Sequence, residues 1–258
     1  MLETNDHIAA LVAVFDEIWR PDPGNRPVST DMLRALVHSG NYVSGAYLDG
    51  DLVGGSVGFF GSPLGLDLHS HMAGVSTAGR GRNVGYALKF HQRDWALQRG
   101  IEQITWTFDP LVARNAFFNL GKLGALPTSY HRDFYGDVGD ELGGGDESDR
   151  LLVTWHIKDP RPVPAPDSGS LTAAGAVTVI DDSVPGEPRV VPDSMHAEVI
   201  VVPIPTDIET MRREDPAAAS RWRLASRVVL EELLADGERT AAFDRTGRYV
   251  FAKSGALS

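Results

Sequence analysis

Cysteine is absent from this chain of 258 residues, which excludes disulfide bonds, thiolate metal sites and a cysteine nucleophile. Long apolar runs are lacking too, and the N-terminal segment 1–19 carries acidic residues without a basic start, so neither a signal peptide nor a membrane span is expected. Only 4 of the 24 basic residues are lysine. The net charge of −11 lacks the basic excess that non-specific nucleic-acid binding needs. We expect a cytoplasmic protein that binds neither nucleic acid nor membranes.

The length allows a substantial core, arranged as one large or two small domains. Apolar spacing in the first part of the chain predicts a mixed α+β order. Three glycines in one predicted strand, Gly54, Gly55 and Gly58, indicate that a ligand or a neighbouring element approaches closely there. Helices are expected at about 6–19, 30–38 and 84–98, and strands at 42–48, 52–60, 66–75 and 101–108.

Short polar residues and glycine indicate where these elements begin and end. Asn5 or Asp6 is expected to cap the first helix, and Ser29 or Thr30 the second. Asp49-Gly50 between the first two strands is a strong hairpin signal. Two helices and a hairpin therefore precede the third strand.

The most informative segment is Arg80-Gly81-Arg82-Asn83-Val84-Gly85, between the strand 66–75 and the amphipathic helix 84–98. A short turn at this position leaves the first helical N–H groups without intrahelical partners. These donors and the positive end of the helix dipole favour an anion. The two arginines add charge-assisted bonds suited to phosphate. The segment therefore predicts a phosphate-binding turn.

A second run, Arg114-Asn115-Ala116-Phe117-Phe118-Asn119-Leu120-Gly121-Lys122-Leu123-Gly124-Ala125, follows Asp109-Pro110 at the end of the strand 101–108. It predicts a short helix, and Gly124 suits the left-handed position at a helix end. Asn115 either caps this helix or contacts a ligand, and the sequence leaves both roles open.

These two runs resemble motifs A and B of the GNAT-type N-acetyltransferase superfamily. Motif A reads Gln/Arg-x-x-Gly-x-Gly/Ala: Arg80 takes the first position, Gly85 the last, and Asn83 stands where a glycine is usual. Asparagine tolerates the left-handed backbone better than most residues. Motif B opens with a polar residue, here Asn115, and ends in Lys-x-Gly, here 122–124. The resemblance covers roughly residues 1–157, is densest over 66–125, and extends to a sparsely characterised bacterial branch of the superfamily.

The resemblance implies a mostly antiparallel sheet flanked by helices and acetyl-CoA as the acyl donor. By analogy, the turn 80–85 holds the pyrophosphate of coenzyme A and Asn115 lies near the cofactor. The strands before and after the phosphate-binding turn part, and the backbone of Ala73-Gly74-Val75 contacts the pantetheine. An amine of a small molecule or peptide would then attack the thioester directly. The sequence indicates neither the acceptor, the acyl chain length nor the oligomeric state.

The catalytic acid departs from the family pattern. Many members carry a tyrosine in motif B that protonates the leaving thiolate, and Leu120 occupies this position here. Tyr130 or Tyr135 in the following segment, or water, are the alternatives.

His71 and His69 are the first candidates for the base, because they alternate along one strand and so face the same side. A structural role for one or both is an equally good interpretation. Asp109 is the next candidate, although a turn-forming role before Pro110 is favoured. No third ligand accompanies the two histidines, so no metal site is expected.

Alternating prolines from Pro160 to Pro166 predict an extended linker. We therefore expect a domain at 1–157, a linker at 158–175 and a C-terminal α/β lobe at 176–258 packed on the first domain. The acidic, glycine-rich run 139–149 is expected to be a surface loop. The remaining elements are expected as strands at 151–157, 176–180, 198–204, 239–243 and 249–252, and helices from Thr206 and over 216–234.

The sequence thus favours an acyl-CoA-dependent N-acyltransferase. Leu120 keeps open a second hypothesis, a non-catalytic CoA-binding sensor or assembly protein. A third is an enzyme that binds another phosphorylated ligand at the same turn.

Overall fold

The computed structural model describes residues 1–22, 26–62, 65–136, 146–191, 194–235, 237, 239–244 and 246–256. The chain divides into two compact units. The first holds Met1–Trp106 with His156–Asp159, and the second holds the other described residues from Thr107 onward. Within the described ranges, no helix combines the length and the apolar character of a membrane span.

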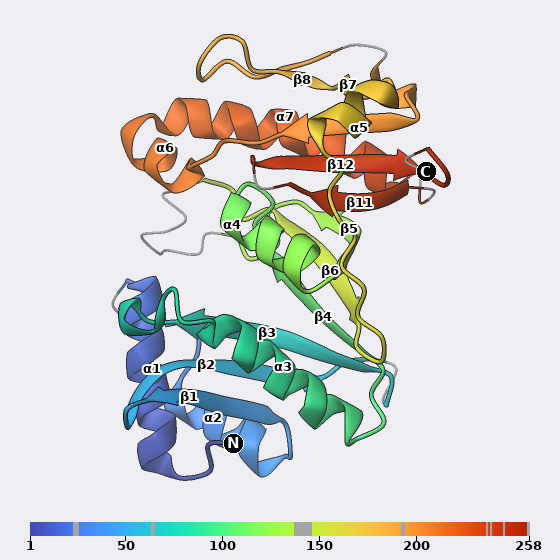
Figure 1. The fold of residues 1–258 in the computed structure, drawn as a ribbon. Coiled ribbons are helices and arrows are strands. Elements are labelled where there is room, and N and C mark those ends of the chain that lie inside the picture. The colour runs from blue at the N-terminus through green and yellow to red at the C-terminus, as the bar shows by residue number, and fades with distance from the viewer. Residues whose placement is uncertain are drawn as a thin grey trace. The chain divides into compact units, whose positions relative to one another are not determined.

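The first unit is a sheet with helices on both faces (Figure 1). Its strands follow the order β1-β2-β3-β4, antiparallel except for the parallel pair β3 and β4. Helices α1 and α2 pack on one face and α3 on the other. The elements are α1 (Asn5–Trp19), α2 (Thr30–His38), β1 (Tyr42–Leu48), β2 (Asp51–Phe60), β3 (Asp67–Val75), the 3₁₀ turn η1 (Thr77–Gly79), α3 (Val84–Leu97) and β4 (Gln103–Phe108), whose last two residues belong to the second unit.

Side-chain caps fix the helix starts. Ser29 accepts a hydrogen bond from the Met32 amide, as one of the two predicted caps of α2. The cap of α1 is Thr4, which accepts from the His7 amide, and not Asn5 or Asp6 as predicted. The predicted hairpin turn is confirmed: Asp49 and Gly50 have φ of 53° and 95°, the two left-handed residues of a type I′ turn.

The glycines of β2 make room for neighbouring elements. A Cβ atom on Gly55 would lie 2.2 Å from the Leu11 side chain of α1 and 2.8 Å from the Ser44 carbonyl oxygen. On β3, a Cβ on Gly74 would lie 2.9 Å from both Ile18 and Trp19 of α1. The close approach predicted for this sheet is therefore made by α1 and the adjacent strand.

The second unit contains a four-stranded sheet of order β11-β12-β10-β7, the antiparallel pair β5 and β6, and the small pair β8 and β9 (Figure 1). The long helix α7 packs against α6 and β5. The elements are α4 (Ala113–Ala116), the π-helical segment η2 (Phe117–Lys122), β5 (Leu126–His131), β6 (Arg150–His156, its last residue in the first unit), α5 (Ser168–Ala173), β7 (Val177–Thr178), β8 (Ile180–Asp181), β9 (Arg189–Val190), the 3₁₀ turn η3 (Ser194–His196), β10 (Val199–Pro203), α6 (Ile208–Glu214), α7 (Pro216–Ala235), β11 (Arg239–Phe243) and β12 (Arg248–Lys253).

The predicted α+β class, a mostly antiparallel sheet flanked by helices with a further C-terminal sheet, is confirmed. Residues 107–136 and 146–155 belong to the same compact unit as the C-terminal segment; for example, the Tyr249 hydroxyl donates to the Pro110 carbonyl at 2.8 Å. The compact units therefore differ from the sequence-based limits 1–157, 158–175 and 176–258, which stay a prediction about domains.

Part of the predicted acidic surface loop is buried. Residues 137–145 lie outside the described part of the chain. Ser148 and Asp149, at the end of the run, are buried, and Asp149 is fully enclosed. It accepts hydrogen bonds from Arg227 and Tyr130, so here the surface-loop prediction is wrong.

Candidate functional site

The turn between β3 and α3 has the backbone that phosphate binding requires. After η1, Gly81 and Asn83 adopt left-handed conformations with φ of 73° and 59°. Asn83 thus fills the glycine-like position without a glycine, as predicted. Gly79 lets the turn pack closely, since a Cβ there would lie 2.7 Å from the Val75 side chain.

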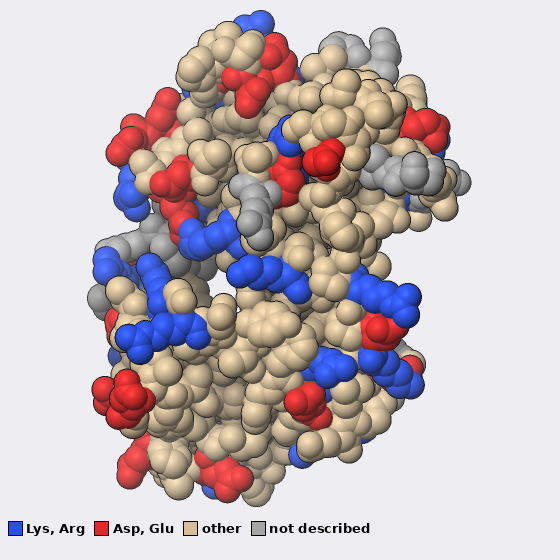
Figure 2. All heavy atoms as spheres, viewed as in Figure 1, with Lys and Arg blue, Asp and Glu red and all other residues tan. Residues whose placement is uncertain are grey.

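The start of α3 leaves backbone donors unused. No side chain caps this helix end. Within the described ranges, the amides of Val84, Gly85 and Tyr86 have no hydrogen-bond partner. Arg80 and Arg82 are exposed, and basic side chains gather over this turn (Figure 2). The turn therefore combines free amides, the positive end of the helix dipole and two exposed positive charges, which are features that favour phosphate.

The ladder between β3 and β4 is short. It pairs Asp67 with Gln103, Leu68 with Ile104 and His69 with Thr105, and then ends. Strand β3 continues for six residues, whose ladder in the described part of the chain is with β2 alone. Alternate backbone groups of 73–75 therefore face away from β2, where the resemblance places the pantetheine.

His69 and His71 lie together on β3, with ring centroids 6.3 Å apart. Both rings also contact Phe59 of β2, at 5.2 and 5.7 Å. Burial, followed by the neighbouring charges of His71 and Lys89, lowers the pKa of His69 to about 4. Burial also lowers the pKa of His71. Both imidazoles are therefore neutral at pH 7 and hold a lone pair that accepts a proton.

A hydrogen-bond chain orients His69. The Thr105 hydroxyl donates to Asp67 Oδ2 at 3.0 Å, and the same hydroxyl oxygen lies 3.3 Å from His69 Nδ1. Because Thr105 has one hydrogen to give, Nδ1 of His69 is the donor in the second bond. This tautomer leaves Nε2 of His69 with the basic lone pair.

Sequence reasoning missed one group in the first unit, Lys89 of α3. Its side chain is 4% exposed, and its ammonium donates to the Ser70 hydroxyl at 2.8 Å. The signal was present in the sequence: Lys89 and Gln92 fall on the same helical stripe as Leu88 and Trp95, and all four are buried.

Asp109, predicted as an alternative base, belongs to an ion cluster in the second unit. It accepts hydrogen bonds from Arg223 at 2.9 and 3.0 Å and from Arg212 at 2.5 Å. Burial alone would raise the pKa of Asp109, but Arg223 and Arg212 hold it well below its usual range. A carboxylate stabilised in this way is a very weak base, so we do not propose it for catalysis.

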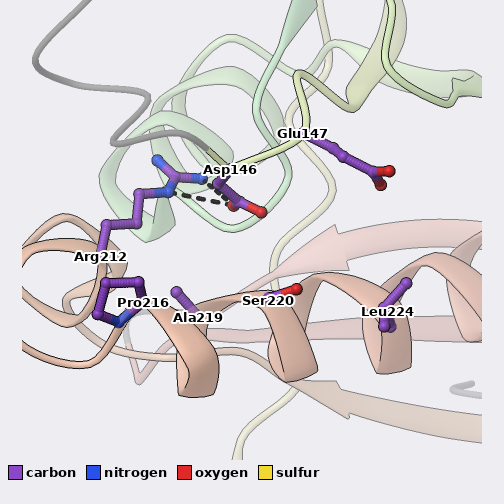
Figure 3. A pocket seen from close by; sticks show the side chains of 7 residues that line it. All are labelled: Asp146, Glu147, Arg212, Pro216, Ala219, Ser220 and Leu224. Carbon is purple, nitrogen blue, oxygen red and sulfur yellow. Dashed lines mark hydrogen bonds and ion pairs between the residues drawn. The ribbon is translucent and has the colours of Figure 1, made fainter. Parts of the chain in front are cut away.

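Asp146 completes this cluster by bonding to the same two arginines. Figure 3 shows Asp146 and Arg212 pointing toward one another above the first turns of α7. They border a cavity of about 250 Å³. Glu147, which also lines it, pairs with Arg227. The charges around this cavity are therefore already matched by partners within the second unit.

The motif B residues also lie in the second unit. Asn115 is exposed and is the third residue of α4, which is capped by Val112, so the interpretation of Asn115 as the helix cap is wrong. Leu120 is 2% exposed within η2. Gly124 ends this segment with the predicted left-handed φ of 73°.

The two tyrosines considered as acids differ in environment. Burial and the hydrogen bond that Tyr130 donates to Asp149 raise the pKa of Tyr130, which makes it a poor acid near neutral pH. The Tyr135 side chain is 43% exposed, and its hydroxyl lies 3.3 Å from the Thr107 hydroxyl. Over the described ranges, no three His, Asp or Glu side chains are grouped to hold a metal ion.

No family model matches the chain, and no curated protein matches it. Similar solved structures include YncA from Salmonella typhimurium with its cofactor acetyl-CoA (16% identity, 65% of this chain and 96% of that chain, TM-score 0.49). A second is the ribosomal-protein-S18-alanine N-acetyltransferase from Escherichia coli (14% identity, 65% of this chain and 94% of that chain, TM-score 0.46). A third is an aminoglycoside 6'-N-acetyltransferase complexed with coenzyme A (13% identity, 64% of this chain and 95% of that chain, TM-score 0.45). Likeness of this degree says nothing of the reaction or the substrates of this chain.

Proposed function

We propose that this protein is an acyl-CoA-dependent N-acyltransferase whose first unit binds acetyl-CoA at Arg80–Gly85. The observation that carries the proposal is the start of α3, where two exposed arginines and three amides without a partner among the described residues follow a strand whose ladder with β4 ends early. The pyrophosphate would bind at this turn, and the backbone of 73–75 would align the pantetheine along β3. A role of Asn115 at the cofactor stays a prediction from the resemblance.

The reaction we propose is direct transfer to an amine. The neutral amine attacks the thioester carbonyl, a C–N bond forms and the C–S bond breaks. His71 or His69 takes the proton that the amine loses, and the departing thiolate receives a proton. Both histidines are neutral near pH 7, which suits a proton acceptor. The acceptor is proposed as a small-molecule or peptide amine, and no metal takes part.

Calorimetric titration with acetyl-CoA, CoA and ATP tests the binding step. The double variant Arg80→Ala, Arg82→Ala should weaken CoA binding by about ten- to a hundred-fold, because the two contacts of exposed arginines together contribute about 1.4–2.8 kcal/mol. Arg26→Ala, Arg34→Ala is the matched control, because it removes two exposed arginines from the same unit. Absence of CoA binding by the folded protein, or equal loss in both variants, refutes the proposed site.

A non-catalytic CoA-binding protein is the second candidate, favoured by Leu120 in place of the family's tyrosine. Catalytic turnover distinguishes the acyltransferase from the non-catalytic CoA-binding protein. Incubation with acetyl-CoA and a panel of amines should release free thiol from an enzyme, whereas a sensor binds CoA and releases none.

A further inference from the structure

Lys89 lies where β3 and β4 part. The last ladder pair joins His69 to Thr105, and the next residues along the two strands are Ser70 and Trp106. The Lys89 ammonium lies 2.8 Å from the Ser70 hydroxyl and 3.7 Å from the centroid of the Trp106 ring. It therefore lies on the face of the sheet that α3 covers, beside the side chains that follow the last ladder pair.

This ammonium is costly to bury. Lys89 has no carboxylate partner in the described part of the chain, and Ser70 accepts one of its three hydrogens. The Trp106 ring compensates part of the lost hydration through a cation–π contact. An unpaired buried charge is destabilising, and an apolar side chain of similar volume fills such a place at lower cost. A charge kept at this position indicates a ligand of opposite charge.

We propose that Lys89 binds the sulfur of coenzyme A at the opening between β3 and β4, stabilises it as a thiolate and gives it a proton. The inference rests on the proposed function and supplies the acid that Leu120 cannot. When the C–S bond breaks, the electron pair stays on sulfur and one proton moves from the Lys89 ammonium to it. Lys89 regains a proton from solvent, while the proton lost by the amine leaves through His71 or His69.

The surroundings of Lys89 suit this role. Burial lowers the pKa of Lys89 to about 7, so its protonated and neutral forms coexist near neutral pH, as an efficient general acid requires. The elements around it carry these titratable or charged groups: Tyr42 and Tyr47 on β1, Asp51 on β2, Asp67, His69 and His71 on β3, and Tyr86, His91, Arg93 and Asp94 on α3. Among these, His69 feels the charge of Lys89, and the two groups have opposite roles in the reaction.

The ultraviolet absorbance of the thiolate tests the proposal without an acceptor. Free CoA is titrated with base in the presence of excess wild type, Lys89→Met or Lys158→Met. The last is the matched control, because Lys158 is an exposed lysine of the first unit. Because the thiolate and the Lys89 ammonium stabilise each other's charged form, bound CoA should ionise at a pH lower by about one unit or more than free CoA in the wild type and the control. In Lys89→Met the shift should vanish while CoA still binds.

Ser70→Ala is a second variant in case Lys89→Met fails to fold, which circular dichroism reveals. Removing the hydroxyl that holds the ammonium should reduce the shift by at least half. If CoA binds but the shift is absent, or persists in Lys89→Met, the role of Lys89 is refuted and the proposed function stands. If CoA does not bind to the wild type, the proposed function itself is refuted.

Discussion

Asp109 and Arg223 are 114 residues apart in the chain and are joined by two hydrogen bonds of 2.9 and 3.0 Å. Arg212 and Asp146 complete a buried cluster of two carboxylates and two guanidinium groups. The cluster links the residue that follows β4 to the long helix α7. The second unit is therefore held together by charge as well as by its apolar core.

We predict that Asp109→Asn lowers the free energy of unfolding by about 3–5 kcal/mol, because it leaves Arg223 and Arg212 short of one negative charge in a buried site. Since Asp109 has a lowered pKa, its contribution is complete above the unfolded pKa of about 3.9 and is lost as pH falls through the folded value. Urea unfolding followed by tryptophan fluorescence measures the change. Asp182→Asn, at an exposed carboxylate, is the control. Equal midpoints for the two variants would contradict the prediction.

Gly55→Ala should destabilise the first unit by about 1–3 kcal/mol, because the new methyl group overlaps Leu11 and the Ser44 carbonyl oxygen. The urea midpoint reports the loss. Gly169→Ala is the comparison, since a Cβ there meets nothing closer than 3.4 Å. We expect that variant to stay within about 0.5 kcal/mol of the wild type. A tolerated Gly55→Ala would mean that α1 does not pack as closely as described.

Asn83 tests whether backbone or side chain matters at the phosphate turn. Asn83→Val should cost about 1–2 kcal/mol of stability, because a β-branched residue resists the left-handed φ of 59°, and it should weaken CoA binding. Asn83→Gly, which accepts this φ freely, should leave binding unchanged. Calorimetry with CoA measures both variants. Equal loss of affinity in the two would show that the asparagine side chain itself contacts the ligand.

His69 should make the protein sensitive to mild acid. In the folded state its pKa is about 4, whereas the unfolded chain takes up a proton near pH 6.5. The unfolded state therefore binds more protons between these values, and stability falls as pH is lowered through this window. After allowance for solvent screening, the loss is on the order of 1 kcal/mol.

His69→Gln should flatten this slope, as measured by urea midpoints between pH 7 and 4.5. His7→Gln, at an exposed position of α1, should not. Part of the dependence of stability on pH should remain in both variants, because burial also lowers the pKa of His71. If His69→Gln leaves the dependence of stability on pH unchanged, another group causes the sensitivity to acid.

Local signals explain why so many elements were predictable. The hydroxyl of Ser29, the Asp49-Gly50 turn and the apolar spacing of α3 each act within a few residues, so their effect is readable in the sequence. The C-terminal strands and α7 follow the same logic, and α7 begins at Pro216 as expected. The π-helical turn was not predicted: the Leu123 amide bonds to the Phe118 carbonyl, five residues back, which no short pattern specifies.

The site was predictable only where it depends on backbone. The phosphate turn follows from Arg80–Gly85 alone, because glycine, asparagine and a helix start determine its conformation. The environment of Asp109 depends on Arg223, which lies far along the chain. The residues near Asp109-Pro110 contain no pattern that predicts this partner. Lys89 depends on which face of α3 meets the sheet, and its place on the buried stripe was the available clue.

Because Lys89 is buried, the rate at which it is chemically labelled reports how often α3 moves away from the sheet. Of the four lysines, Lys89 is buried and the others reach the surface. A reagent for primary amines should therefore modify Lys122, Lys158 and Lys253 at once, and reach Lys89 only when α3 lifts from the sheet. The rate of that slow labelling, read from the mass of one peptide, measures how often the helix opens. A ligand bound where β3 and β4 part would lower the labelling rate of Lys89.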